Sequence, residues 1–304
     1  MRNYPFDKPG TFYRGNLHAH STNSDGTLTP QEVTTAYREQ DYDFMAVTDH
    51  FMERFGYPVT DTSAYRTSDF TTLFGAELHG KGLENGGLWH ILAIGLPLDF
   101  APQSSDEDGP EIAARARAAG AFVALPHPQW TGVSTKDACT IEDFDAIEVH
   151  NEGHTNDSDR GNGWFLADLL STAGERFSCI AADDAHFNLR PDRFGGWVQV
   201  KSESLEPDAL LAALKSGRFY ASTGPEIHNV TFTDDKIIVE CSEADVVMVG
   251  GHASTCRYVR ESGMTRAVFP IAPFETSFAR VTVIDAHGKK AWTSPIWLDE
   301  LTIT

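Results

Sequence analysis

Two short apolar runs that stop abruptly at polar side chains constrain the fold of this chain more than any other feature. In the first, His18 and His20 are one residue apart, and residues i and i+2 of a β-strand point to the same side. The second, residues 44–47, leads directly to Thr48, Asp49 and His50. Parallel strands of a barrel carry their chemistry at their carboxyl ends, so the two runs predict such strands with one shared site.

Strand-like and helical runs alternate through the first two thirds of the sequence. This order is typical of βα units around a parallel sheet. The pattern alone does not distinguish a barrel from an open doubly wound sheet. No Gly-x-Gly-x-x-Gly follows any strand, which counts against a dinucleotide-binding fold. The predicted strands are residues 43–48, 71–78, 88–96, 121–125, 146–150 and 177–182, and the predicted helices are 30–40, 111–119, 163–173 and 207–215.

The pattern changes after Pro225. Helical periodicity disappears, and short β-rich runs follow, separated by turn residues. Runs of this kind predict a small antiparallel β-sandwich. We therefore expect two domains, residues 1–224 and residues 225–304.

The charge balance limits the partners. The 304 residues include 24 Lys and Arg against 44 Asp and Glu, a net charge of −20. A nucleic-acid-binding surface needs a basic footprint, so we expect no nucleic-acid partner. The N-terminus has no apolar signal segment and no run approaches the length of a membrane span, which predicts a cytoplasmic protein without a membrane partner. The oligomeric state is not predictable from the sequence.

The 4 cysteines are scattered, and no Cys-x-x-Cys occurs. This spacing indicates reduced thiols and argues against both a disulfide scaffold and a thiolate zinc site. Histidine and carboxylate donors without cysteine suit Zn, Mn or Fe.

Three motifs together resemble one family of enzymes. His-x-His at residues 18–20, Ser-Asp-Gly at 24–26 and Thr-Asp-His at 48–50 are similar to the PHP (polymerase and histidinol phosphatase) metallohydrolases. The resemblance extends through roughly the first 220 residues, and the run Phe219–Pro225 resembles the carbaryl-hydrolase-like branch. It implies a distorted (β/α)7 barrel.

The resemblance also implies nine ligands for two or three divalent metal ions. In the family pattern, one carboxylate bridges two metals, and Glu77 matches it. Asp25 stands where some members have a histidine. The implied ligands are His18, His20, Glu77 and Asp184 for a first metal, Glu77, His90 and His127 for a second, and Asp25, His50 and His186 for a third.

Other residues near these positions are candidates for catalysis. Asp49 and Asp183 adjoin implied ligands and are expected to orient histidines or relay protons. An anionic substrate would also need a guanidinium, which binds phosphate bidentately. The arginine candidates are Arg160 and Arg193, with Arg54 and Arg190 in neighbouring loops.

Metal ions of this kind lower the pKa of bound water to near 7, so hydroxide, and not Ser or Cys, would be the nucleophile. The commonest activity in the family implies a hydrolase for a small phosphate ester. The branch resemblance suggests carbamate or carboxylic-ester hydrolysis as an alternative. A third hypothesis is a metal-binding module without turnover, whose β-rich part serves interaction.

The remaining histidines and one glutamate are given structural roles. Glu148 is interpreted as a hydrogen-bonded strand residue and not as a general base. The histidines left outside the ligand set are His79 as an off-face neighbour of Glu77, His150 as pocket lining, His154 in a loop, and His228, His252 and His287 on the surface.

Overall fold

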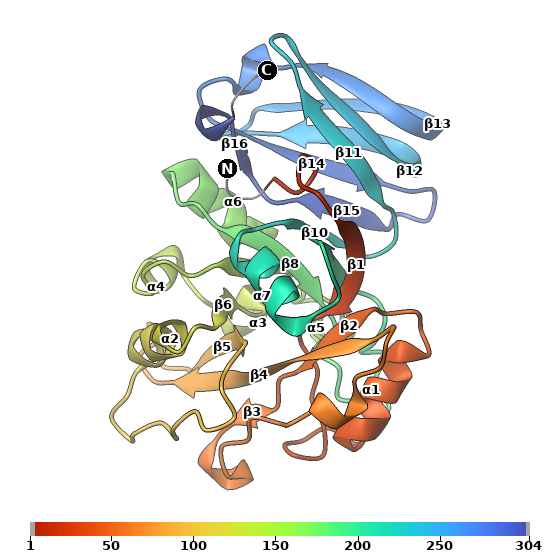
Figure 1. Ribbon diagram of the computed structural model, residues 1–304. Helices are drawn as coiled ribbons and strands as arrows, with labels where there is room; N and C mark the ends of the chain where they lie inside the picture. The colour runs from red at the N-terminus through yellow and green to blue at the C-terminus, as the bar shows by residue number, and fades with distance from the viewer. Residues whose placement is uncertain (1–3, 302–304) are drawn as a thin grey trace.

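The computed structural model describes residues 4–301. Its N-terminal part forms the lower half of Figure 1, where strands and helices alternate. The strands are β1 (Thr11–Asn16), β2 (Phe44–Val47), β3 (His50–Phe51), β4 (Thr71–Gly80), β5 (Trp89–Ile94), β6 (Phe122–Leu125), β7 (Ala146–Asn151), β8 (Ser178–Ala182), β9 (Trp197–Ser202) and β10 (Phe219–Ser222). The helices are α1 (Pro30–Arg38), α2 (Gly109–Ala118), α3 (Pro128–Thr131), α4 (Thr135–Ala138), α5 (Glu152–Ser158), α6 (Trp164–Ala173) and α7 (Pro207–Lys215).

Helix α1 begins as its capping residues predict. The Thr29 side chain accepts a hydrogen bond from the Glu32 amide, and the Glu32 carboxylate accepts one from the Thr29 amide at 2.8 Å. Pro30 fills the first helical position, where its missing N–H is no loss. Asp108 and Glu111 cap α2 in the same reciprocal way. The four predicted helices are all present, with ends that differ by two residues or fewer.

The sheet differs from the distorted (β/α)7 barrel that the family resemblance implies. Strands β1, β2 and β4 are parallel, as are β6, β7 and β8, but β5 is antiparallel to both of its neighbours. The strand order is β9-β1-β2-β4-β5-β6-β7-β8, and the sheet is open at β8. The prediction of an α/β fold is therefore confirmed, and that of a distorted (β/α)7 barrel is not.

The physical reason is the strand that occupies the free edge of β1. Residues 11–15 of β1 pair antiparallel with residues 198–202 of β9, so β8 has no edge to join along that length. Beyond it, Ala19 and Ala185 form a single parallel bridge, in which the His20 amide donates to the Ala185 carbonyl at 2.8 Å. Strand β8 also lies near β9 and β10 but is not hydrogen-bonded to either as a sheet neighbour. Strand β9 was not predicted.

The C-terminal part, in the upper half of Figure 1, consists of antiparallel strands, as its turn-rich sequence predicts. Strand β12 is a single strand of 15 residues, longer than the short β-rich runs that the sequence predicts. It has register shifts between Glu240 and Val246, so its first half pairs with β11 and its second half with β14, while β13 follows both halves. The strands are β11 (Ile227–Phe232), β12 (Lys236–Gly250), β13 (Cys256–Pro270), β14 (Phe278–Ile284), β15 (Lys290–Thr293) and β16 (Ile296–Trp297).

The two parts share one sheet. Strand β10 pairs with β9 on one side and with β15 on the other, so the hydrogen-bonded ladder crosses position 224 without interruption. The apolar cores are nevertheless distinct: one lies between β4–β8 and helices α2 and α6, another within β11–β15. The boundary between residues 224 and 225 stays a prediction.

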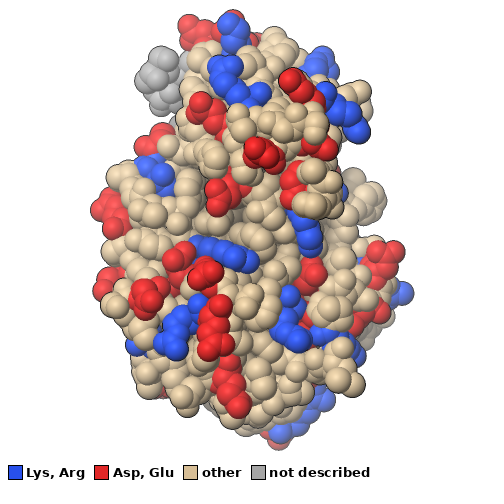
Figure 2. Space-filling view, turned by 90° about the vertical axis from the view of Figure 1, so that its right-hand side faces the viewer, with Lys and Arg blue, Asp and Glu red and all other residues tan. Residues whose placement is uncertain are grey.

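Two surface features bear on possible partners. In the part of the chain that the structure describes, no helix is both long and apolar enough to cross a membrane. On the face in Figure 2, basic and acidic side chains are interspersed, without a continuous basic surface.

Candidate metal centre

The nine side chains predicted as metal ligands gather in one place. They fall into overlapping groups, within each of which the ligand atoms lie within 4.8 Å of one another. Glu77 belongs to three groups, as the predicted bridging carboxylate would. The groups are His20, Asp25, His50 and His186; His18, His127 and Asp184; His18, His20 and Glu77; His50, Glu77 and His79; and Glu77, His90 and His127.

The strand directions explain this convergence. Parallel strands bring their carboxyl ends together, which places the residues that follow β1, β6 and β8 at one edge. Strand β5 runs the opposite way, so its first residues meet the last residues of β4. His90 is thereby paired in register with His79, two residues beyond Glu77.

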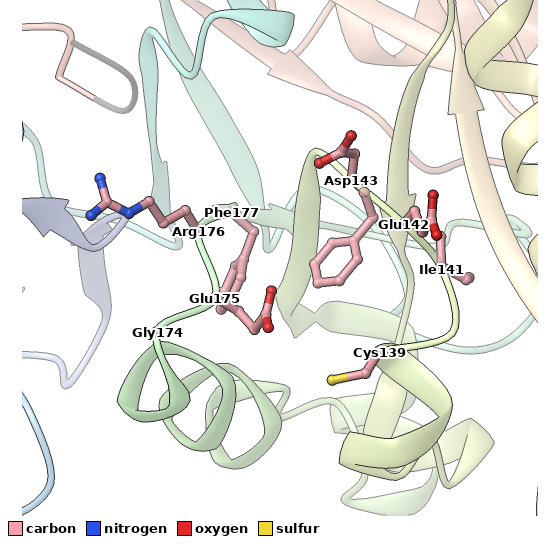
Figure 3. A pocket seen from close by; sticks show the side chains of 9 residues that line it. Cys139, Ile141, Glu142, Asp143, Gly174, Glu175, Arg176 and Phe177 are labelled. Carbon is pink, nitrogen blue, oxygen red and sulfur yellow. The ribbon is translucent and has the colours of Figure 1, made fainter.

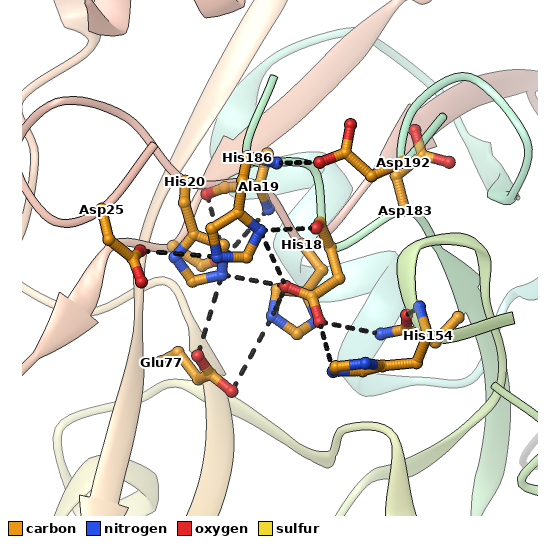
Figure 4. A network of polar contacts seen from close by, with 12 residues as sticks. His18, Ala19, His20, Asp25, Glu77, His154, Asp183, His186 and Asp192 are labelled. Carbon is orange, nitrogen blue, oxygen red and sulfur yellow. Dashed lines mark hydrogen bonds and ion pairs between the residues drawn. The ribbon is translucent and has the colours of Figure 1, made fainter. Parts of the chain in front are cut away.

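Several polar atoms of this cluster lack a hydrogen bond although other donor atoms lie close to them. His18 Nε2 lies 3.2 Å from Asp184 Oδ1 and 3.9 Å from Glu77 Oε1, yet it is buried without a hydrogen bond (Figure 4). Glu77 Oε2 and His50 Nδ1 are also buried without a well-aligned hydrogen bond, although they lie 2.6 Å from each other. Buried polar groups normally have partners, so this arrangement fits cations between the donors. Imidazole and carboxylate donors without thiolate suit Zn, Mn or Fe.

Charges inside the cluster keep its carboxylates ionised. Burial favours the neutral form of Glu77, but the charges of His90 and His50 and the nearby imidazoles of His127 and His18 outweigh it and hold its pKa well below the ordinary value. Burial likewise opposes ionisation of Asp184, and His18 is the first of the groups that lower its pKa. Both carboxylates are therefore in the form that binds a cation.

Glu148 orients two of the predicted ligands. Its carboxylate is fully buried and lies 3.1 Å from His18 Nδ1, and it accepts a 2.6 Å hydrogen bond from the His127 amide. Asn151 donates to the same carboxylate at 2.9 Å. Glu148 is hydrogen-bonded in its strand, as predicted, and this contact directs the Nε2 of His18 into the cluster.

The backbone at two predicted ligands has the left-handed conformation. His127 has φ 28° and Asp184 has φ 57°. Non-glycine residues rarely adopt positive φ unless surrounding contacts require it. The Asp184 amide donates to the His18 carbonyl at 2.9 Å, and Glu148 holds the His127 amide. These bonds fix both side chains toward the cluster.

Among the described residues, the carboxylates of Asp49 and Asp183 accept hydrogen bonds from loop residues and from Tyr37 of α1, and none from a histidine. Asp49 accepts hydrogen bonds from the Ser21 amide and from the hydroxyls of Ser21, Ser24 and Thr60, and so holds the loop that carries Asp25.

Asp183 accepts hydrogen bonds from the Tyr37 hydroxyl and from the amides of residues 194–196. Burial is the largest cause that raises the pKa of Asp183, to about 6. The structure thus gives both aspartates positioning contacts; a proton relay stays a prediction.

The candidate arginines lie outside the ligand groups. Arg193 donates to Asp192, whose carboxylate accepts from the His186 amide at 2.8 Å. Arg190 pairs with Asp157, and the Arg54 guanidinium lies over the Phe55 ring at 4.6 Å. Arg160 is exposed, and its amide donates to the His154 carbonyl.

Two histidines that sequence reasoning left out belong to the cluster. His79 is buried in β4 and was wrongly placed on the opposite face: it is two residues from Glu77, so both side chains share one face of the strand. That spacing was the available signal. His154 Nε2 lies 3.3 Å from Asp184 Oδ2, on helix α5, which was not predicted. His150 instead pairs with Glu152 at 3.0 Å.

One cavity lies apart from this cluster. It is lined by Cys139 and by residues 141–144 and 174–177, and Figure 3 shows acidic side chains and Arg176 around it. None of the nine predicted ligands lines it.

Comparison with solved structures supports the fold. A two-domain protein from Bacteroides vulgatus, described as containing a predicted PHP-like metal-dependent phosphoesterase, superposes with a TM-score of 0.53 at 15% identity, over 97% of this chain and 99% of that one. The chain therefore shares the fold of a two-domain protein. The likeness at this identity concerns the fold alone.

Two further structures match less closely. A candidate metal-dependent phosphoesterase from Bifidobacterium adolescentis has a TM-score of 0.44 at 15% identity, over 59% of this chain and 90% of its own. An amidohydrolase from Chromobacterium violaceum has a TM-score of 0.41 at 14% identity, over 57% and 87%. No protein-family model matches the sequence. No curated protein matches it either.

Proposed function

We propose that this protein is a metal-dependent hydrolase that acts on a small phosphate ester, with the nine clustered side chains as ligands of two or three divalent ions. The observation that carries the proposal is the convergence of His18, His127 and His186, distant in sequence, on the shared carboxylates Glu77 and Asp184. Clusters of buried, unpaired donors of this kind have few purposes other than metal binding.

The residues of the cluster have different proposed roles. Glu77 lies between the other donors, with Oε1 at 2.7 Å from His90 Nδ1 and Oε2 at 2.6 Å from His50 Nδ1, so it is placed to bridge neighbouring ions. When bound, divalent ions would lower the pKa of water and polarise the phosphoryl oxygens. Glu148, Asn151 and the backbone at residues 127 and 184 keep the donors in place before substrate arrives.

Arg160 is the arginine that we propose for the substrate's charge. It is exposed, and its guanidinium has no hydrogen bond or ion pair with any described residue, whereas Arg193 is engaged by Asp192. Its backbone adjoins His154, which reaches Asp184. A guanidinium without a partner in the protein can make bidentate contact with phosphate. A small-molecule substrate and a cytoplasmic location remain part of the proposal.

The test is a substrate panel. Protein purified without chelator and loaded with Zn, Mn or Fe is assayed against p-nitrophenyl phosphate, bis-p-nitrophenyl phosphate and naphthyl esters. We expect turnover of a phosphate ester that is lost with chelator and restored by metal. The Glu226→Gln variant, altered at an exposed carboxylate just before β11, is the control and should match the wild type.

Other outcomes would replace the proposal. Turnover of naphthyl esters with none of either phosphate ester would favour the carbamate or carboxylic-ester hypothesis. Bound metal without turnover of any substrate would favour the metal-binding module. Absence of metal binding would refute the proposal in all its forms.

A further inference from the structure

We propose that His79, the Oε2 atom of Glu77 and the Nδ1 atom of His50 form an additional cation position, next to the three that the family resemblance implies. The inference rests on the proposed metal-dependent function, since it enlarges the same centre. It makes His79 a metal ligand, although the family's sequence pattern does not include this histidine among the ligands.

Strand geometry places His79 in the centre. Glu77 and His79 are residues i and i+2 of β4, so their side chains leave the strand on the same face. His79 Nε2 lies 4.0 Å from Glu77 Oε2. Its ring centroid is 4.9 Å from that of His50 and 4.4 Å from that of His90. All three of these neighbours, Glu77, His50 and His90, are among the predicted metal ligands.

His50 faces two different donor groups with its two ring nitrogens. Its Nε2 lies 3.4 Å from Asp25 Oδ1, within the group that also contains His186. Its Nδ1 lies 2.6 Å from Glu77 Oε2, on the side where His79 sits. One histidine therefore borders both the position implied by the family pattern and the new one.

Three buried atoms at this place lack hydrogen bonds. They are Glu77 Oε2, His50 Nδ1 and the Nδ1 of His79 itself, whose side chain is about nineteen-twentieths buried. A histidine that served only to fill space would be expected to donate or accept a hydrogen bond when buried this deeply. A cation between Glu77, His50 and a ring nitrogen of His79 would share Glu77 Oε2 with the main centre. His50 would have to lose its ring proton to bind cations through both nitrogens. Imidazole with one carboxylate oxygen is a suitable set for Zn or Fe.

The test measures metal content and not turnover. Wild type, His79→Leu, His79→Asp and the exposed-site control His228→Ala are dialysed against a series of free Zn²⁺ concentrations, and bound zinc per chain is determined by plasma mass spectrometry. His79→Leu keeps an apolar volume but removes the donor, whereas His79→Asp supplies a ligand oxygen.

We expect His79→Leu to lose one bound ion per chain, or to bind the weakest ion about 10- to 100-fold less tightly. His79→Asp should recover much of this binding, and His228→Ala should equal wild type. If both His79 variants bind zinc as wild type does, the additional position is refuted while the main centre stands. If both lose binding equally, His79 acts through packing and is not a ligand. If wild type binds no zinc, manganese or iron, the proposed function itself fails.

Discussion

The two parts of this molecule use histidine in opposite ways, although one sheet joins them. In the N-terminal part, His18, His20 and His127 are almost fully buried around shared carboxylates. In the C-terminal part, His228, His252 and His287 are exposed. The difference lies in topology: parallel strands deliver the residues that follow them to one edge, whereas antiparallel strands distribute them over both ends.

The C-terminal part is nonetheless held firmly against the part that carries the cluster. Arg280 lies 3.1 Å from Asp168 of α6 and its guanidinium stacks over the Trp164 ring at 3.9 Å. The Cys179 amide of β8 donates to the Ser294 hydroxyl at 2.9 Å. These contacts support the base of β8 and leave the cluster untouched, which predicts that the two parts respond differently to substitution.

The largest effect is expected at the shared carboxylate. Glu77→Gln removes a charge from three ligand groups at once and should lower hydrolytic kcat/KM at least about 10³-fold, equivalent to about 4 kcal/mol. Steady-state kinetics on the best phosphate ester measures it. The matched Glu226→Gln variant should lose less than about twofold, since a surface substitution rarely changes stability by more than about 0.5 kcal/mol. Equal losses of kcat/KM in both variants would contradict the view that the N-terminal part alone carries the catalytic centre.

A smaller effect is expected at Glu148. In Glu148→Gln, one oxygen can still accept from His18, but the new amide nitrogen faces the His127 amide, where two donors oppose each other. Affinity for zinc should fall about 10- to 100-fold, as for residues that orient metal ligands. Competition with a chromophoric chelator measures the affinity. The control is Glu240→Gln, an exposed carboxylate of β12, and unchanged affinity in Glu148→Gln would show that His18 is held by other means.

Ser294→Ala should separate stability from activity. It leaves the buried Cys179 amide without its acceptor, at a cost of about 1–3 kcal/mol in the free energy of unfolding. Denaturant unfolding measures this loss, and kcat/KM should remain at the wild-type value because no ligand contacts Ser294. A parallel loss of metal binding would contradict the separation of the two parts.

The smallest effect is expected at the start of α1. Thr29→Ala removes the side chain that caps the Glu32 amide, and an N-cap of this kind stabilises by about 1 kcal/mol. Thermal unfolding should show a correspondingly small decrease, with Thr29→Ser as the control that keeps the hydroxyl. No difference between the two variants would mean that the exposed cap contributes nothing to the fold.

The sequence predicted the cluster better than the sheet that builds it. His18, His20 and Glu77 could be found because short-range patterns carry them: an i, i+2 pair, and apolar runs that end at polar residues. His79 follows the same i, i+2 rule and was still assigned to the wrong face. His154 gives no comparable signal, because only the fold of α5 brings it to Asp184.

The open sheet could not be predicted because its cause is long-range. Strand β9 reaches β1 from nearly two hundred residues away and takes the edge that would close a barrel. The sequence of residues 11–16 gives no signal that they will pair with β9. The antiparallel direction of β5 could not be predicted either, because an apolar run in the sequence does not show whether its strand will be parallel or antiparallel to its neighbours.

Anomalous diffraction from crystals grown with Zn²⁺ or Mn²⁺ tests the central claim most directly. The account predicts at least two strong anomalous peaks, each within coordination distance of a Glu77 or Asp184 oxygen and of two or more histidines of the cluster. Peaks confined to exposed histidines such as His228, with none among His18, His127 and His186, would contradict it.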